Sequence, residues 1–198
     1  MPTILYLHGF NSAPQSVKGR ILASAAAALA QPPRFHLPQL SHRPAQAMRD
    51  VCAWIDREAP GGRDLALIGS SLGGFYATFL AEKYAARAVL INPAIRPHED
   101  LRPFAGRQKN LYGEEYEITP AHFDELSALA IPRITRPDRY FLLARTGDEI
   151  LDWRESVAFY AGAFQYVAGG GDHGWTDFHA EAASVLRFAG SGRRAGPA

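Results

Sequence analysis

The segment from Asp64 to Glu82, DLALIGSSLGGFYATFLAE, restricts the possible fold more than any other part of the chain. An apolar run typical of a buried strand, residues 65–69, leads directly into a helical pattern, so the chain must reverse direction sharply between them. The residues at the reversal are Gly69-Ser70-Ser71-Leu72-Gly73, which fit the pattern G-x-S-x-G only with Ser71 at the centre. At such a turn the positions two before and two after the serine come too close for a Cβ atom, so both must be glycine. We therefore expect a nucleophile elbow that exposes the Ser71 hydroxyl above a sheet.

A five-residue pattern of this kind also arises by chance. The flanking residues decide between a chance match and a nucleophile elbow. Gly74, Ala77 and Ala81 form a stripe of small residues that would allow the following helix to pack closely on a sheet. A phosphate-binding loop is excluded because no lysine follows the glycines, as G-x-x-x-x-G-K-[ST] requires.

The composition is that of an ordinary globular protein. With 198 residues, 47% of them hydrophobic, we expect one domain over residues 1–190 and a flexible tail over 191–198. The net charge of +1 argues against a nucleic-acid partner. No apolar run is long enough for a membrane span, and the single cysteine, Cys52, together with the lack of a signal-like start, favours the cytoplasm.

Strands and helices alternate along most of the chain. Apolar runs predict strands at residues 3–7, 34–37, 65–69, 87–91, 139–144 and 164–167. Helical periodicity lies between them at 16–30 and from Pro44 to the glycines after Pro60, and again at 176–189. This alternation predicts an α/β fold, a minimal α/β-hydrolase with a mostly parallel sheet of about six strands and helices on both faces.

Residues 96–138 interrupt the alternation. Five prolines and four aromatic residues stand there among mixed charges, which predicts an irregular insertion with short helices. Such an insertion would form a partial lid over the carboxyl ends of the strands, although a surface excursion with its own apolar cluster fits equally well. Its aromatic residues favour an apolar acyl group in a substrate, unless they form the core of the insertion itself.

A serine nucleophile needs a base and an acid, and several side chains compete for these roles. Asp148 comes directly after the strand at 139–144, whereas Asp152 starts the pattern D-x-x-E and is better explained as a helix N-cap. His173 lies in a glycine-rich loop after the last strand, whereas His179 falls in the first helical turn, where the helix dipole disfavours a protonated imidazole. The chain order Ser71, Asp148, His173 is the order that the α/β-hydrolase fold requires.

The backbone must also stabilise the negative charge of a tetrahedral intermediate. The N–H of Leu72, at the start of the helix after the elbow, is one candidate donor, and the N–H of Phe10, in the loop after the first strand, is the other. His8, just before this loop, is better suited to hold the loop by hydrogen bonding than to act as the base. No H-E-x-x-H or paired-cysteine spacing indicates a metal, and no cofactor is expected.

Longer stretches of the chain resemble a known family. The segments LYLHGFNSAPQS, IGSSLGGFYAT, NLYGEEYEIT, TGDEILDWR and GGGDHGWTDF are similar to the successive signatures of the small bacterial YqiA/YcfP-type esterases of the α/β-hydrolase superfamily. By that resemblance Ser71 matches the nucleophile, Asp148 the acid and His173 the base. The activity that the resemblance implies is hydrolysis of carboxylic esters, with acyl-CoA thioesters as a second class of substrate.

Two alternatives stay open at this stage. An acyltransferase would use the same three side chains with an alcohol in place of water as acceptor, and sequence does not determine that choice. A non-catalytic protein that binds a small molecule could retain the fold, but it would not need all three side chains. The expected partner is a small-molecule ester or thioester, and the oligomeric state is not determined by the sequence.

Overall fold

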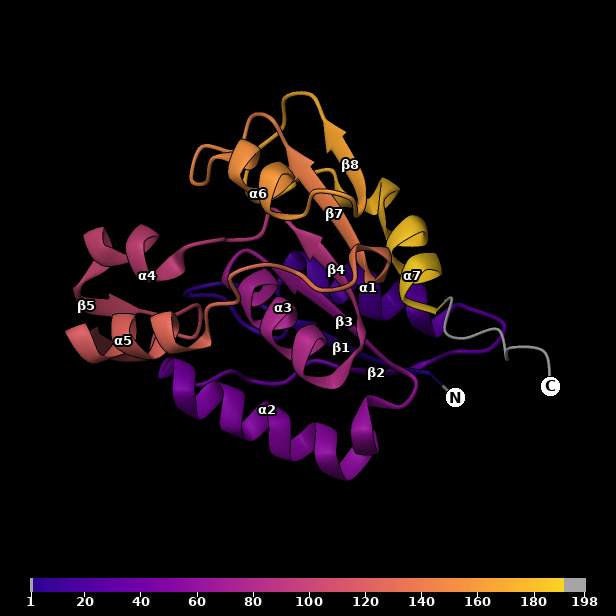
Figure 1. Ribbon diagram of the computed structural model, residues 1–198, viewed down its shortest axis with the longest axis horizontal. Coiled ribbons are helices and arrows are strands. Elements are labelled where there is room, and N and C mark those ends of the chain that lie inside the picture. Colours follow the sequence, from indigo (N-terminus) through magenta and orange to yellow (C-terminus); the bar gives the residue numbers. More distant parts are fainter. Residues whose placement is uncertain (1, 191–198) are drawn as a thin grey trace.

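A computed structural model describes residues 2–190, and the predicted tail at 191–198 lies outside these residues. Its centre is a six-stranded parallel sheet with the strand order β2-β1-β3-β4-β7-β8 (Figure 1). The strands are β1 (Thr3–Leu7), β2 (Arg34–His36), β3 (Leu65–Ser70), β4 (Arg87–Ile91), β7 (Tyr140–Arg145) and β8 (Phe164–Ala168). All six predicted strands are present, and their bounds differ from the prediction by one residue at most.

Burial in the sheet follows the strand order. Every residue of the interior strands β1 and β3 is buried, as expected for parallel strands covered on both faces. The edge strand β8 is exposed over most of its length. The loops after β1, β3 and β7, which carry the predicted site residues Phe10, Ser71 and Asp148, therefore follow interior strands of the sheet.

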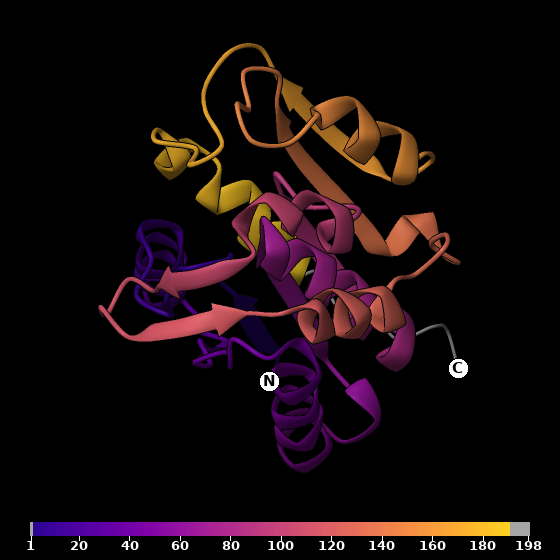
Figure 2. The ribbon, with the colours of Figure 1, turned by 90° about the vertical axis from the view of Figure 1, so that its left-hand side faces the viewer.

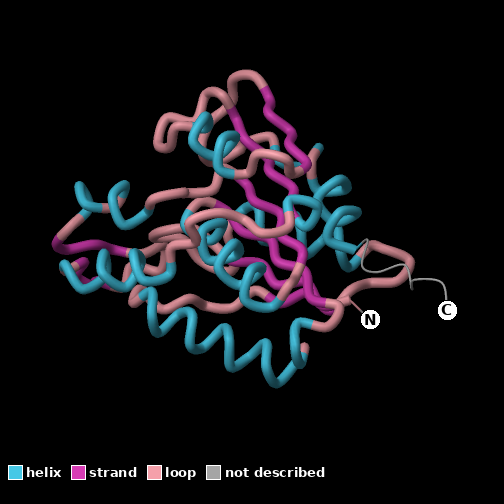
Figure 3. The backbone as a smooth tube through the Cα atoms, in the orientation of Figure 1, coloured by secondary structure: helices cyan, strands magenta, loops and turns pink. Residues whose placement is uncertain are grey.

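Helices cover both faces of the sheet (Figures 1 and 3). Helices α1 (Val17–Ala27) and α7 (Ala182–Gly190) pack on the face that carries Ile4 and Tyr6. Helices α2 (Pro44–Glu58), α3 (Leu72–Tyr84) and α6 (Trp153–Phe159) pack on the face that carries Leu5 and Leu7. The alternation of side chains along β1 thus divides the core into two layers.

Helix ends follow the local chemistry of the sequence. Ser16 caps α1 through a bond from the Gly19 N–H, and Asp152 caps α6 by accepting from the Arg154 N–H at 3.0 Å, as the D-x-x-E pattern predicts. The predicted helix at 176–189 is too long at its start, because residues Phe178–Ala180 form a 3₁₀ turn and α7 begins only at Ala182. The helix predicted for 16–30 ends at Ala27, and Val17 at its start is exposed although it fits the apolar period.

The insertion is more regular than its composition predicts. It contains α4 (Pro97–Asp100), the antiparallel pair β5 (Gly106–Lys109) and β6 (Glu115–Ile118), and α5 (Pro120–Leu129), with 3₁₀ turns at Arg102–Phe104 and Pro137–Arg139 (Figure 2). The short strands were not predicted because alternating charged residues give them no apolar run. The hairpin contacts the loop after β1, where Leu111 N–H donates to the Asn11 oxygen at 3.1 Å.

Within residues 2–190, no helix has the length and apolar character that crossing a bilayer requires. The same residues contain no group of three or more His, Cys, Asp or Glu side chains placed to hold a metal ion.

Candidate active site

The turn between β3 and α3 has the geometry of a nucleophile elbow. Ser71 adopts φ 56° and ψ −124°, a conformation that residues with a side chain rarely take. A Cβ at Gly69 would lie 2.2 Å from the Gly73 oxygen, and a Cβ at Gly73 would lie 2.0 Å from the Leu7 oxygen. Neither distance is sterically possible, so both elbow glycines are required by close backbone approach, as the sequence predicts.

The strained turn is held on both sides. The Ser71 N–H donates to the Ile91 oxygen at 3.0 Å, and the Ser71 oxygen accepts from the N–H groups of Gly74 and Ala94. These bonds join the elbow to the end of β4 and to the first turn of α3. The Ser71 side chain therefore projects from a rigid frame at the carboxyl edge of the sheet.

Three side chains from distant parts of the chain form a hydrogen-bonded row at this edge. The Nε2 atom of His173 lies 3.0 Å from the Ser71 Oγ, and its Nδ1 atom lies 2.8 Å from the Asp148 Oδ2. Ser71 comes from the elbow, Asp148 from the turn after β7, and His173 from the loop after β8. With Nδ1 protonated and donating to Asp148, Nε2 is free to accept the serine proton.

Asp148 is suited to stay ionised. Its side chain is only 2% exposed, and burial alone would raise the pKa of its carboxyl group. The hydrogen bond from His173 and those from the N–H groups of Ile150 and Leu151, both 2.9 Å from Oδ1, outweigh burial and lower the pKa of Asp148 below its ordinary value. A negative charge is thus maintained beside the imidazole.

The backbone of the histidine loop is anchored by three side chains. The Asn92 amide donates to the His173 oxygen at 3.0 Å, and Glu149 accepts from the His173 N–H at 2.9 Å. Lys18, near the start of α1, donates from Nζ to the Gly174 oxygen. These contacts fix the loop from the β4 end, from the β7 turn and from the opposite helix layer.

Sequence reasoning did not assign these anchoring roles. For Asn92, its place directly after β4 was a usable signal, because polar groups at the carboxyl ends of parallel strands meet at one edge of the sheet. Nothing in the sequence connects Lys18 to a loop 156 positions away.

Phe10 and Leu72, the predicted oxyanion donors, both line one cavity at the elbow. The loop that carries Phe10 passes close to the nucleophile, because a Cβ at Gly9 would lie 3.1 Å from the Ser71 Cβ. Within residues 2–190 the N–H groups of Phe10 and Leu72 have no hydrogen-bond partner. Both donors are therefore available to a ligand in this cavity.

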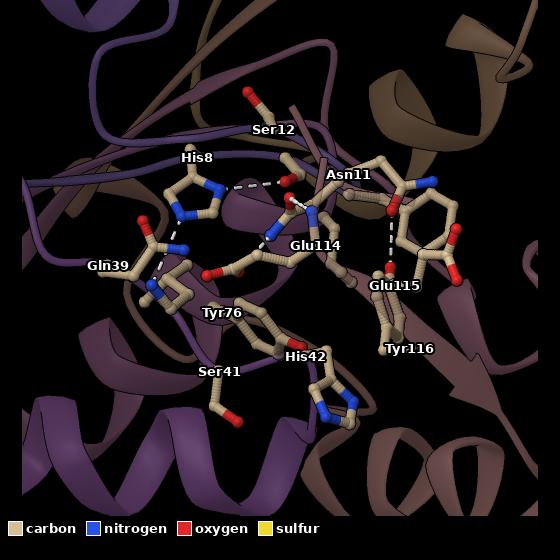
Figure 4. A pocket seen from close by; sticks show the side chains of 15 residues that line it. His8, Asn11, Ser12, Gln39, Ser41, His42, Tyr76, Glu114, Glu115 and Tyr116 are labelled. Atoms are coloured by element: carbon tan, nitrogen blue, oxygen red, sulfur yellow. Dashed lines mark hydrogen bonds between the residues drawn. The ribbon is translucent and has the colours of Figure 1, made fainter. Parts of the chain in front are cut away.

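His8 does not reach the serine and instead holds its loop, as expected. Its Nε2 accepts from the Leu40 N–H at 3.3 Å, so its proton is on Nδ1, which donates to the Gly9 oxygen at 3.0 Å (Figure 4). Burial lowers the pKa of His8, which keeps it neutral. His179 is exposed in the 3₁₀ turn before α7 and takes no part in the row.

Known proteins share this architecture. A crystal structure of a provisionally described hydrolase from Agrobacterium vitis S4 has 19% identity and a TM-score of 0.73, with 95% of this chain and 87% of that chain covered. Alpha/beta hydrolase domain-containing protein 10 from mouse has 19% identity and a TM-score of 0.69, with 94% and 88% covered. The esterase domain of a Rhodothermus marinus protein has 18% identity and a TM-score of 0.67, with 96% and 85% covered. At these identities the likeness shows the fold, which is that of the α/β hydrolases.

The match to a protein family covers nearly all of the chain. The model described as "Uncharacterised protein family (UPF0227)" matches residues 3–190, which include the elbow, the insertion and the histidine loop. The chain therefore belongs to the UPF0227 family, the YqiA/YcfP family that its sequence resembles.

Proposed function

We propose that this protein is a serine hydrolase that cleaves carboxylic esters through an acyl-enzyme intermediate. The observation that carries the proposal is the row of hydrogen bonds in which His173 lies 3.0 Å from the Ser71 Oγ and 2.8 Å from Asp148. Serine, histidine and aspartate in this arrangement form a catalytic triad on several unrelated folds, so the geometry supports the activity independently of the fold.

The reaction follows from the contacts of these groups. The Ser71 Oγ attacks the ester carbonyl carbon as its proton passes to the His173 Nε2, and Asp148 stabilises the imidazolium that forms. The carbonyl oxygen becomes an oxyanion that accepts from the N–H groups of Phe10 and Leu72. Collapse of the intermediate breaks the bond to the alcohol, which leaves with the proton from His173. A water molecule then repeats the sequence on the acyl-Ser71 ester and releases the acid.

Relatives of the same fold add support to this chemistry. Est1E from Butyrivibrio proteoclasticus has 14% identity and a TM-score of 0.69, and another matched chain is named as an esterase domain. A thioester presents the same carbonyl carbon to the serine, so acyl-CoA hydrolysis is a second reaction of the same site.

The direct test is labelling with a fluorophosphonate probe together with turnover of p-nitrophenyl acetate. We expect Ser71→Ala to abolish labelling and to lower kcat by roughly 10³-fold or more. Ser70→Ala is the matched control, because Ser70 is the neighbouring serine within β3 and is not in the row. Equal labelling of wild-type protein and Ser71→Ala would refute the assignment, and failure of the wild type to react at all would favour a non-catalytic binding protein.

A second set of measurements identifies the preferred substrate, ester or thioester, and the preferred acceptor of the acyl group, water or an alcohol. Rates on short p-nitrophenyl esters and on acyl-CoA compare ester with thioester, and added alcohols compete with water for the acyl-enzyme. A hydrolase releases the free acid whether or not alcohol is present, whereas an acyltransferase forms the new ester.

A further inference from the structure

The cavity beside the elbow has many polar side chains in its lining. Its volume is about 400 Å³, and it extends from Phe10 and Leu72 to the hairpin of the insertion. Most of its lining side chains carry hydroxyl, amide, imidazole or carboxylate groups. Among the aromatic residues of the insertion, Tyr116 lines the cavity, whereas Phe104 and Tyr112 are 42% and 52% exposed at the surface.

Tyr76 places an unpaired hydroxyl group in this cavity. It lies one helical turn after Leu72 on α3, and its side chain is buried, with 2% of the residue exposed. Its hydroxyl has no hydrogen-bond partner among residues 2–190, and burial raises its pKa, so it stays protonated as a donor. The oxygen is accessible from the cavity, and a hydroxyl that has no partner within the protein can donate to a polar atom of a ligand bound there.

His42 supplies a second donor through a relay of histidines. The Thr119 N–H donates to the Nδ1 of His122 at 3.1 Å, so neutral His122 carries its proton on Nε2. That nitrogen lies 3.2 Å from the His42 Nδ1, which must accept, and the His42 proton is therefore on Nε2. Burial lowers the pKa of both imidazoles, which favours these neutral forms.

His42 is one of the residues that line the cavity. Its Nε2 has no partner among residues 2–190, and its ring stacks on Tyr116 with 4.7 Å between centroids. Figure 4 shows Tyr76 between His42 and Glu114 in the view into the cavity. The two donors thus come from different elements, α3 and the loop before α2. Tyr76 is buried, whereas His42 is exposed and has one face stacked on Tyr116.

Charge in the cavity has one sign. The carboxylates of Glu114 and Glu115 contribute to the lining, and the Asn110 amide orients Glu114 with a 2.7 Å hydrogen bond. Among residues 2–190, no lysine or arginine lines the cavity. The exposed carboxylates of Glu114 and Glu115 would disfavour an anionic substituent there, whereas hydroxyl groups could donate to the carboxylates and accept from the two donors.

We propose that the cavity selects esters bearing an uncharged, hydroxylated group, which hydrogen-bonds to Tyr76, His42 and Glu114, over esters with alkyl or anionic groups of the same size. This inference rests on the proposed ester hydrolysis and names its substrate class. Either the acyl or the alcohol side of the ester can carry the hydroxyl groups, and the experiment below has one arm for each.

Isosteric substrates separate polarity from size. In the acyl arm, p-nitrophenyl 3-hydroxybutanoate is compared with p-nitrophenyl 3-methylbutanoate, in which a methyl group replaces the hydroxyl, and with the anionic half-ester of succinate. In the alcohol arm, glycerol 1-acetate is compared with 2-methylbutyl acetate. We expect kcat/KM to be at least about fivefold higher for the hydroxylated member in one arm, because each paired hydroxyl contributes one hydrogen bond. The succinate half-ester should be the slowest acyl substrate.

Tyr76→Phe tests the site itself, because it removes only the hydroxyl. The preference for the hydroxylated isostere should fall by roughly fivefold. Tyr160→Phe is the matched control: Tyr160 is also buried, but its hydroxyl lies 2.7 Å from Thr78 and outside the cavity, so the preference should not change. Circular dichroism of each variant checks that the fold is retained.

The outcomes distinguish this inference from the proposed function. Turnover without a preference for the hydroxylated isosteres in either arm, or a preference that Tyr76→Phe leaves intact, overturns the substrate class and leaves ester hydrolysis standing. Absence of turnover and of fluorophosphonate labelling overturns both.

Discussion

The side-chain amide of Asn92 donates to the main-chain oxygen of His173, with 3.0 Å between Nδ2 and O, although 81 positions separate the two residues. The same amide donates to the Asp172 oxygen, and its Oδ1 accepts from the Arg145 N–H at 2.9 Å. Asn92 is 3% exposed and has a φ of 42°, a backbone conformation that asparagine tolerates better than most residues. It therefore joins the end of β4 to the end of β7 and to the histidine loop.

Asn92→Asp should impair catalysis more than folding. A carboxylate would face two carbonyl oxygens, so the loop should move and kcat/KM on p-nitrophenyl esters should fall roughly 10- to 100-fold. The free energy of unfolding should fall by about 1 to 3 kcal/mol, because the two carbonyl groups lose their donor. Gln165→Glu makes the same change at an amide that donates to the Val157 and Tyr160 oxygens, far from the serine, and should retain activity. Equal loss of activity in both variants would argue against a positioning role for Asn92.

Asp148→Asn should lower kcat by about 10⁴-fold, because an amide cannot hold the imidazole in the required tautomer. Asp152→Asn is the control: Asp152 caps α6 and pairs with the exposed Arg154 but has no contact with His173, and asparagine is an equally good cap. Activity of Asp148→Asn near that of the wild type, measured in initial-rate assays, would exclude Asp148 as the acid.

The wild-type protein and Asp148→Asn should also differ in how their stability depends on pH. Because the pKa of Asp148 is lower in the folded state than its unfolded value near 3.9, the ionised carboxylate stabilises the fold above that pH. This contribution is lost as pH falls through the folded-state pKa. Urea unfolding between pH 2 and 7 should show a wild-type advantage over Asp148→Asn that is present at neutral pH and shrinks in acid. An advantage that grows as pH falls would contradict the lowered pKa.

Lys18 should give a second pH dependence of stability, and here burial of the charged form, rather than hydrogen bonding to it, lowers the pKa. Burial lowers its pKa to about 8, against the opposing effect of Asp172 and Asp148, so the unfolded chain binds more protons at this side chain between pH 8 and the ordinary value near 10.4. Across that interval the free energy of unfolding of the wild type should rise relative to that of Lys18→Met, measured in parallel urea titrations. A constant or falling difference would show that Lys18 is not desolvated.

Gly73→Ala should prevent the native turn from forming. The new methyl group would overlap the Leu7 oxygen at 2.0 Å, and removing this overlap requires β1 and α3 to separate, at a cost of about 3 kcal/mol or more. Gly169→Ala is the control, because a Cβ at Gly169 has no neighbour within 4 Å. Thermal unfolding followed by circular dichroism should show a large loss for the first variant only.

Features that depend on neighbouring residues could be predicted from the sequence. The elbow, the six strands and the α6 cap each arise from contiguous residues whose steric and hydrogen-bonding properties act locally. The candidate side chains Ser71, Asp148 and His173 could be selected because the carboxyl ends of parallel strands meet at one edge of a sheet.

Only the tertiary structure determined which distant groups support that row and which substrate groups the cavity accepts. The amide of Asn92 and the ammonium of Lys18 act through partners that the folded chain brings to them, and the fold places the hydroxyl of Tyr76 in the lining of the cavity. The β5–β6 hairpin is likewise defined by its cross-strand pairing and by its contact with Asn11, and has no local apolar signal. Local sterics and strand order are encoded in short stretches of sequence, whereas the pairing of polar groups depends on where each side chain points once the layers have packed.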